Sequence, residues 1–581
     1  MKYLQSQRFL ATFLSCAFFV SMVALFGCQG LGNSNNGGAN PTPTPSSGTG
    51  TFNGILNWKG SNSRNGLYSN ETVLTPANVN VSQFGKKSVF HVDGLAIAQP
   101  LVVTGVNMGP AGTHNVLIVA TEHDSIFAFD ADNPGAAPLW QRSYLDAANG
   151  VTPMADNFGG RTALGGEIGI TGTPVVDSNT GAVYFVTTLA RNGKAEQWLR
   201  SVDITTGKDF GAGSMQIVAS VPGDGKGTVN GQIPFDPSLQ NQRPGLALLN
   251  GNVLISWGSF SDFGVYHGWL MAYDAATLKQ VAVFNPTPQA QPNDVAGGVA
   301  DHGGGGSFWG GGAAPAIDSD GSIFVVSADG SNNADTGGHN FGDSVLKVQL
   351  NGNTFQVVDW FSPANRDCID EADLEIGSGG VALLPSEVGA GKNVAAVISK
   401  EGRLFILDRA SLGHFNAAGD TQVPASFMVG NKTCFFGMGG GFAEGPDWQR
   451  IYGNVSYWNG NIYVGPANSP LKQYAFTNGL PTSTPVAQSG TSSSLRGMNT
   501  VVSANGNTNG IVWAYEKSAN GGQAILHAYD ATNIGRELWN SNMAGARDAL
   551  PVATAFGVPV VVNGRVIAAA DSTVTIFAAL Q

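Results

Sequence analysis

One phrase recurs along this chain and limits its fold more than any other feature: alternating apolar residues, an Asp, a turn and a further strand. It first occurs as Ser125-Ile-Phe-Ala-Phe-Asp130, which leads to Leu139-Trp140. Further copies lie at residues 198–203, 269–274, 403–408 and 525–530, with weaker copies at 344–350 and 471–476. A period of two predicts β-strands, and Asp with Thr-Gly or Asn-Gly nearby predicts hairpin turns. We therefore predict an all-β chain.

The spacing of these copies predicts the architecture. They recur at roughly 55 to 75 residues with about four strands each, which is typical of β-propeller blades that carry insertions. The last strand, residues 574–579, has no following strand, and we predict that residues 87–103 supply its partner and close the ring. Seven copies and this composite blade predict an eight-bladed β-propeller. Two stacked β-sandwiches are the alternative, but no linker-like segment lies mid-chain.

Composition agrees with a sheet protein and excludes one class of partner. Glycine accounts for 80 of 581 residues, and charged residues for only 12%, against averages of about 7% and about 25%. Such a composition favours sheets and tight turns over surface helices. The net charge of −12 offers no basic patch, so we expect no nucleic-acid partner. We expect a monomer.

Residues 1–27 have the features of a bacterial lipoprotein signal peptide. Lys2 and Arg8 provide positive charge, residues 9–26 are mainly apolar, and Gly27 directly precedes Cys28. Cys28 is therefore the predicted lipidation residue, although Phe26 is bulkier than usual for such a signal. An uncleaved membrane anchor is the alternative, since an apolar run of this length could just span a bilayer. Both interpretations place the remaining chain outside the cytoplasm.

Residues 28–52 predict a tether, and residues 53–581 a single propeller domain. The tether is rich in Gly, Ser, Asn, Thr and Pro and has no charged residue, a composition that is typical of flexible or extended linkers. The residue that follows the predicted lipidated cysteine is Gln29. An Asp at this position would disfavour the outer membrane, so Gln29 favours it. We expect an outer-membrane lipoprotein, periplasmic or surface-exposed, which contacts the membrane through its N-terminal lipid.

Two cysteines remain in the predicted propeller, Cys368 and Cys434. In an oxidising compartment two such cysteines could form one disulfide. Their separation in sequence does not determine the distance between them, so the sequence leaves the bond open. A role as metal ligands is less favoured, because neither has a second cysteine nearby.

The Asp-x-x-Thr-Gly phrases resemble the blade repeats of the pyrroloquinoline quinone (PQQ) dehydrogenases. Residues 57–79 are similar to the N-terminal segment of those enzymes, and residues 562–577 to their last blade. Residues 113–124 and 168–174 are similar to a set of bacterial PQQ-repeat-like propeller proteins. The resemblance implies a quinoprotein dehydrogenase-like propeller of eight blades, closed by pairing of its terminal strands.

The same resemblance implies a site at the mouth of the propeller. Such a site has Ca²⁺ held by oxygen ligands, a carboxylate base, a cation beside the quinone and a flat surface below it. The matching positions are Asp373 for the base, Asp262 with Asn332 or Asn333 for Ca²⁺, Lys400 for the quinone contact and Trp309 for the flat surface.

Each of these residues also has a structural interpretation. Trp309 could pack between blades, Lys400 could lie at a hairpin tip, and Asn332 and Asn333 suit a turn. Asp373 follows Asp367, Asp370 and Glu371 and could belong to a solvated acidic loop. The chain also departs from the enzymes: it has no adjacent cysteine pair and no Cys-x-x-Cys-His for a c-type haem.

Two functions from different classes follow. The first is a PQQ- and Ca²⁺-dependent dehydrogenase of an alcohol or sugar. The second is a non-catalytic propeller scaffold that binds a protein or glycan at the cell envelope. Fold alone does not separate them. Gly-x-Ser-x-Gly, His-Glu-x-x-His and phosphate-loop motifs are absent from the sequence.

Overall fold

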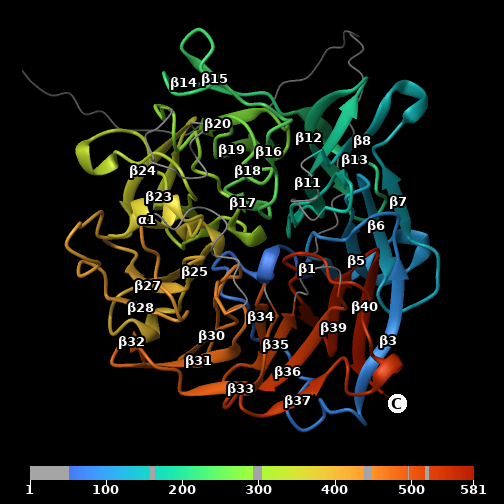
Figure 1. The fold of residues 1–581 in the computed structure, drawn as a ribbon. Coiled ribbons are helices and arrows are strands. Elements are labelled where there is room, and N and C mark those ends of the chain that lie inside the picture. The colour runs from blue at the N-terminus through green and yellow to red at the C-terminus, as the bar shows by residue number, and fades with distance from the viewer. Residues whose placement is uncertain are drawn as a thin grey trace, which may run out of the picture. The chain divides into compact units, whose positions relative to one another are not determined.

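The computed structural model describes residues 52–157, 164–291, 304–436, 447–494, 496–516 and 522–580, which belong to one compact unit, residues 50–581. Their strands form eight sheets of four to six strands, arranged as blades around a centre (Figure 1), and one separate two-stranded hairpin. This confirms the predicted all-β fold of eight blades. The predicted signal peptide, Cys28 and most of the tether lie outside the described residues.

The blades follow one another along the chain, each with its strands in the same order from the centre outward. Blades 1 and 2 contain β1 (Asn53–Ile55), β4 (Leu101–Asn107), β5 (Thr113–Ala120), β6 (Ser125–Asp130) and β7 (Trp140–Ser143), then β8 (Val151–Ala155), β9 (Glu167–Ile168), β10 (Val175–Val176), β11 (Ala182–Arg191), β12 (Lys194–Asp203) and β13 (Asp209–Gln216). The separate hairpin is β14 (Ser220–Pro222) with β15 (Gln232–Pro234). Blades 3 and 4 contain β16 (Gln240–Asn241), β17 (Ala247–Leu249), β18 (Asn252–Ser259), β19 (Trp269–Asp274) and β20 (Gln280–Phe284), then β21 (Ala316–Ile317), β22 (Ile323–Val326), β23 (Val345–Asn351) and β24 (Thr354–Phe361).

The second half of the ring repeats this order. Blades 5 and 6 contain β25 (Val381–Leu383), β26 (Val394–Ile398), β27 (Arg403–Asp408) and β28 (Ala425–Met428), then β29 (Ser456–Trp458), β30 (Asn461–Val464), β31 (Pro470–Thr477), β32 (Leu480–Pro481) and β33 (Ala487–Ser492). Blades 7 and 8 contain β2 (Leu67–Tyr68), β34 (Met498–Asn505), β35 (Thr508–Glu516), β36 (Ile525–Asp530) and β37 (Glu537–Asn540), then β38 (Val560–Val562), β39 (Arg565–Ala570), β40 (Thr573–Ala579) and β3 (Phe84–His91).

The recurring phrase of the sequence forms the third main strand of every blade. In β19 all residues but the final Asp274 are buried, because both faces of a blade pack against its neighbours. Tyr184 of blade 2 and Trp257 of blade 3, for example, belong to one hydrophobic cluster. The Asp that ends the phrase caps the turn: Oδ1 of Asp274 accepts a hydrogen bond from the backbone N of Thr277 at 2.8 Å.

The ring closes by pairing strands from the two ends of the described chain. β3 pairs with β40 in antiparallel register, from Phe84 opposite Ala579 to His91 opposite Thr573. The predicted closure is therefore confirmed, but its predicted partner, residues 87–103, was placed too late. That segment contains the end of β3 and the start of β4, and β4 lies in blade 1.

Residues 57–70, which we call the N-terminal plug, cross the inner strands near the centre of the ring, where Figure 1 shows a short blue helical turn. Nζ of Lys59 donates hydrogen bonds to the backbone oxygens of Asn454 and Val455 at 3.2 and 3.3 Å. Nε of Arg64 donates to the backbone oxygen of Pro315 at 3.0 Å. Both side chains are fully buried, and burial lowers the pKa of Lys59 to about 7.

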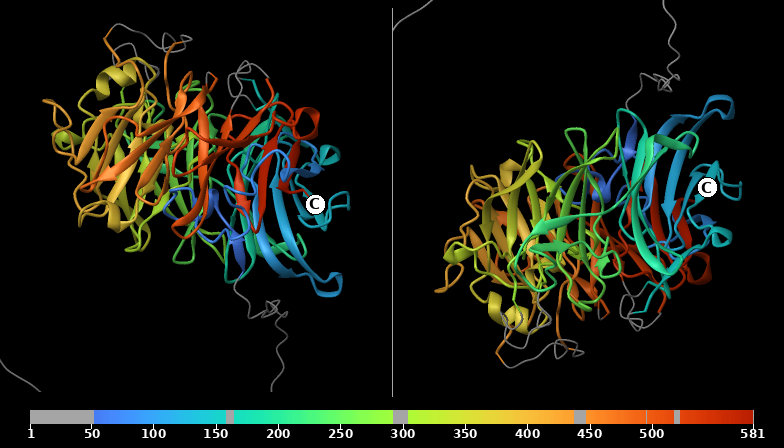
Figure 2. Two further views of the ribbon diagram at one scale, coloured as in Figure 1. Left: turned by 90° about the horizontal axis from the view of Figure 1, so that it is seen from below. Right: turned by 90° about the horizontal axis from the view of Figure 1, so that it is seen from above.

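One α-helix, α1 (Arg366–Glu371), lies between blades 4 and 5. Figure 2 shows the ring edge-on, with α1 in yellow at one of its two faces. A disulfide joins Cys368 of α1 to Cys434, with 6.0 Å between the Cα atoms. Within the described residues no helix is both long and apolar enough to cross a membrane.

Candidate functional site

All six residues of the predicted site lie at one face of the ring, which we call the mouth. Successive strands of a blade are antiparallel, so the loop between its second and third main strands lies at the same face as the connection to the next blade. The loops 260–268, 327–344 and 399–402 carry Asp262, Asn332, Asn333 and Lys400. The connections 304–315 and 362–380 carry Trp309 and Asp373.

A buried lysine joins two carboxylates at the mouth. Nζ of Lys400 forms a short ion pair with Asp373 and donates to Oε2 of Glu375 at 3.2 Å. Burial alone would lower the pKa of Lys400, but the charges of Asp373 and Glu375 raise it well above its usual value. Lys400 is therefore a fixed positive charge at this position.

Glu375 connects this ion pair to the predicted flat surface. Its Oε1 accepts a hydrogen bond from Nε1 of Trp309 at 3.2 Å, while its Oε2 receives Lys400. Burial raises the pKa of Glu375 to about 7, and Lys400 opposes that rise. The structure thus brings three predicted residues, Trp309, Lys400 and Asp373, around a fourth that the sequence did not single out.

The charges of Asp373 and Lys400 also act on Asp262. Ser259 Oγ donates to Oδ1 of Asp262 at 2.7 Å, and burial together with the charge of Asp373 raises the pKa of Asp262. Asp262 and Asp373 both have positive φ, 57° and 55°. Such backbone is uncommon outside glycine and often occurs at functional sites.

Carboxylates form the core of the mouth. Asp329, Asp373 and Glu375 each place one oxygen within 4.8 Å of the others, and so do Asp329, Asp343 and Asp370. Asp329 belongs to both groups. Apart from Asp373, which is 30% exposed, these side chains are at most 3% exposed.

The side-chain oxygens of the two predicted asparagine ligands already accept hydrogen bonds from the protein. Oδ1 of Asn332 accepts from Nη1 of Arg366 at 3.1 Å, and Oδ1 of Asn333 accepts from the backbone N of Asn340 at 2.9 Å. Their role as metal ligands stays a prediction. The loop that carries both asparagines places Asp329 beside Asp373 and Glu375 instead.

Sequence reasoning did not single out Asp329, Asp343, Asp370 or Glu375 as site residues. A signal existed for two of them, because Asp329 and Glu375 lie within the stretches that resemble the family's site. Asp370 belonged to the acidic run that could have been a solvated loop. That alternative is wrong for Asp370: it lies on α1, is 3% exposed, and accepts a hydrogen bond from the backbone N of Gly330 at 2.6 Å.

Aromatic and basic side chains continue the mouth beyond Trp309. The ring of Phe556 lies 5.7 Å from that of Trp309 and 6.0 Å from that of Tyr452, centroid to centroid. The guanidinium of Arg243 lies 4.8 Å from the centre of the Phe556 ring, and that of Arg450 lies 5.3 Å from the centre of Tyr452. Such a surface suits a flat ligand with negative charge.

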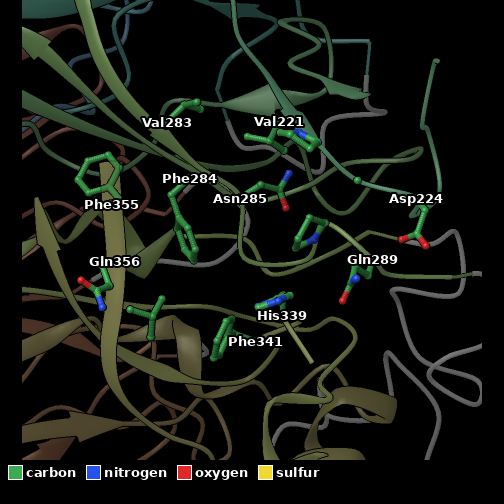
Figure 3. A pocket seen from close by; sticks show the side chains of 14 residues that line it. Val221, Asp224, Val283, Phe284, Asn285, Gln289, His339, Phe341, Phe355 and Gln356 are labelled. Atoms are coloured by element: carbon green, nitrogen blue, oxygen red, sulfur yellow. The ribbon is translucent and has the colours of Figure 1, made fainter. Parts of the chain in front are cut away.

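A separate groove lies on the outer rim, between the hairpin β14–β15 and the outer strands of blades 3 and 4. It encloses about 770 Å³, and Figure 3 shows Phe284, Phe341 and Phe355 with His339 and Asp224 around it. None of the six predicted site residues lines it. The groove is therefore not the predicted site.

Comparison with known proteins identifies the fold. A quinohemoprotein alcohol dehydrogenase from Pseudomonas putida HK5 is similar with a TM-score of 0.56 and 16% identity, over 90% of this chain and 80% of that one. The quinohemoprotein alcohol dehydrogenase from Comamonas testosteroni gives 0.55 and 16% over the same shares. A europium-containing methanol dehydrogenase gives 0.55 and 13%, over 90% and 98%. The chain has the quinoprotein dehydrogenase fold.

At these identities the likeness shows the fold alone. No protein-family model and no curated protein matches the chain. Whether the quinoprotein fold carries its chemistry here therefore depends on the residues at the mouth.

The mouth of this quinoprotein fold has donors suited to the two groups that the resemblance implies. Ca²⁺ prefers oxygen ligands, which Asp329, Asp373 and Glu375 provide. PQQ is planar and carries carboxylates. A site for it would require cations beside the carboxylates and aromatic side chains against the plane of the ring. Three positive charges lie near Tyr452 and oppose the rise that burial causes in its pKa, those of Lys400, Arg450 and Arg496. The donor set thus fits both groups.

Proposed function

We propose that this protein is an exported PQQ-dependent dehydrogenase that oxidises an alcohol or a sugar with the help of a bound cation of the calcium type. The observation that carries the proposal is the ion pair of Lys400 with Asp373 and Glu375, beside Asp329 and Trp309 at the mouth of a quinoprotein fold. A bare propeller needs no such buried set of charges, since unpaired buried charge is costly.

In this proposal the residues of the mouth divide the tasks, and Asp373 has two of them. Asp329, Asp373 and Glu375 would hold the cation, with Asp262 beside them. Lys400 and the arginines of the mouth would hold PQQ, with Trp309 against its ring. The cofactor, when bound, accepts the two electrons of the oxidation.

Asp373 is the base in this scheme. Its side chain is 30% exposed, whereas that of Glu375 is 3% exposed, so Asp373 can meet a substrate hydroxyl and accept its proton. Glu375 keeps Trp309 and Lys400 in place, because its Oε1 accepts a hydrogen bond from Trp309 and its Oε2 accepts one from Lys400.

A titration and one variant test the proposal. Purified protein, stripped of ions, is titrated with PQQ in the presence of Ca²⁺ or Eu³⁺, the second ion chosen because a protein of this fold contains europium. We expect cation-dependent binding near one equivalent, followed by substrate-dependent reduction of a dye. Asp373→Asn should abolish dye reduction, although the variant still folds, as circular dichroism would show. Undiminished activity of this variant would refute the assignment of Asp373.

The second candidate is a non-catalytic scaffold that binds an envelope protein or a glycan. It is favoured by the hydrogen bonds that occupy Asn332 and Asn333 and by the lack of an adjacent cysteine pair. An intact fold that binds neither PQQ nor cation would make this candidate the leading one. Crosslinking followed by pull-down should then recover a partner.

We also propose that Cys28 carries a lipid which holds the protein at the outer membrane. The apolar run before Gly27-Cys28 and the uncharged tether behind it support this. A dehydrogenase in that position would act on substrates outside the cytoplasm.

A further inference from the structure

Three aspartates meet at the mouth beside the ion pair of Lys400. Asp329 and Asp343 lie near the two ends of the loop 327–344, and Asp370 comes from α1. One oxygen of each lies within 4.8 Å of the others, and the three side chains are 3%, 2% and 3% exposed.

Backbone hydrogen bonds fix two of these carboxylates by one oxygen only. Oδ1 of Asp370 accepts from the backbone N of Gly330 at 2.6 Å, and Oδ1 of Asp343 accepts from that of Ile376 at 2.9 Å. Oδ2 of each is buried without a hydrogen-bond partner among the described residues, as is Oδ1 of Asp329. Buried oxygens without partners are costly unless something else binds them.

A buried tyrosine lies near these aspartates. The side chain of Tyr266 is 1% exposed, and its hydroxyl interacts with the carboxylate of Asp262. Tyr266 interacts electrostatically with Asp262, Asp329 and Asp370. It lies on loop 260–268, so a third segment of the chain comes close to the aspartates.

The charge of Lys400 reaches Asp329, but no basic side chain among the described residues pairs directly with any of the three aspartates. Lys400 pairs with Asp373 and Glu375, and Arg366 pairs with Asp335 and Asp367. In the described ranges no lysine, arginine or histidine forms an ion pair with Asp329, Asp343 or Asp370. Three carboxylates this close in a dry interior must either keep protons or share a cation.

We propose that Asp329, Asp343 and Asp370 bind a second hard divalent cation of the calcium class, next to the cation of the proposed function and sharing Asp329 with it. All-oxygen donors suit such an ion, and water can complete its six to eight ligands. Two cations bridged by one carboxylate, about 3.5–4 Å apart, occur in many two-metal sites.

The second cation has a positioning role. It ties both ends of loop 327–344 to α1, which the disulfide at Cys368 attaches to Cys434. It thereby sets the orientation of Asp329, whose carboxylate also reaches Asp373 and Glu375. The proposed second cation site is built from side chains of this protein, and binding of the cation there does not require that the protein bind PQQ.

The experiment counts bound ions with variants that separate the two sites. The full chain, purified in detergent and stripped with a chelator, is titrated with Ca²⁺ by calorimetry, and bound calcium is measured by elemental analysis. We expect two equivalents in the unmodified protein and one each in Asp343→Asn and Asp373→Asn. Asp367→Asn is the matched control on α1, because its side chain is 78% exposed; it should keep two.

The outcomes distinguish this inference from the proposed function. One equivalent that Asp373→Asn removes and Asp343→Asn keeps would overturn the second site and leave the proposed function intact. One equivalent that only Asp343→Asn removes would support the second site and count against the cation of the proposed function. Absence of binding to the folded protein overturns both. Asp370→Asn replaces Asp343→Asn if the latter fails to fold.

Discussion

Glu375 shows how one buried side chain can organise a site. It receives Lys400 and Trp309 on separate oxygens, and the backbone N of Lys400 also donates to its backbone oxygen at 2.9 Å. Loop 399–402 and connection 362–380 are thus joined by both backbone and side chain. A change in the charge of Glu375 therefore reaches Lys400 and Trp309 together.

Removal of the charge on Lys400 should destabilise the fold. Lys400→Met leaves Asp373 and Glu375 without their counter-charge, and breaking a buried pair typically costs about 3–5 kcal/mol. Denaturant unfolding of the ion-free protein measures this loss. Lys432→Met is the matched control: Lys432 pairs with Asp447 at the surface, where such a pair contributes about 0–1 kcal/mol. Equal losses in the two variants would contradict the central role of Lys400.

The buried carboxylates predict how stability depends on pH. Burial raises the pKa of Glu375 to about 7 and that of Asp370 to about 8, from ordinary values of 4.5 and 3.8. The folded protein then holds these protons more tightly than the unfolded chain, so its stability should fall as pH rises from about 4 to 8.

Thermal melts in chelator at pH 5 and pH 8 test this. We expect the lower melting temperature at pH 8, and Ca²⁺ should restore it there, because the ion binds deprotonated carboxylates. A melting temperature that does not change with pH in chelator would mean that these side chains are hydrated.

At the scale of elements, the closing strand β3 depends on one aromatic residue at its start. Phe84 is fully buried and its ring lies 5.1 Å from that of Trp539 and 5.5 Å from that of Trp513. These tryptophans belong to blade 7, so Phe84 attaches the composite blade to its neighbour as well as to β40.

Phe84→Ala should therefore weaken the closure of the ring. Truncation of a buried Phe costs about 3–5 kcal/mol, and we expect faster hydrogen exchange in β3 and β40 along with lower stability to denaturant. Phe436→Ala, at a side chain that is 71% exposed, is the control and should change stability by less than about 0.5 kcal/mol. Unchanged exchange in β40 would show that the blade closes without this contact.

The whole molecule combines a rigid ring with a mouth built from distant parts of the chain. The N-terminal plug fixes the inner strands from the centre, since Lys59 and Arg64 bond to the backbone of connections that lead into blades 6 and 4. Strand β1 lies between the predicted tether and this plug. The start of the propeller is therefore bonded to blades on different sides of the ring.

The predicted lipid anchor belongs to this scale. Cys28→Ser should move the protein from the membrane fraction to the soluble fraction, because several acyl chains are needed for firm attachment. Mass spectrometry of the N-terminal peptide should show the lipid only in the unmodified protein. Membrane retention of the variant would favour the uncleaved anchor instead.

Much of the fold could be predicted because its signals are local. The alternation of β6, β19, β27 and β36 and the Asp that ends each strand depend on neighbouring residues alone, so the sequence by itself determined the strands, the turns and the number of blades. The bounds of the closing strand do not follow from local signals, because the pairing of β3 with β40 defines them.

Which residues form the site depends on the tertiary structure more than the fold class does. Resemblance pointed to Asp373, Lys400 and Trp309, and the fold brings them together. Nothing local distinguishes Asp370 on α1, which meets Asp329 across about forty residues, from the exposed Asp367 beside it. Burial and shared charge arise only when separate loops meet at the mouth, which is why the sequence determined the propeller and only the folded ring decided which carboxylates share a site.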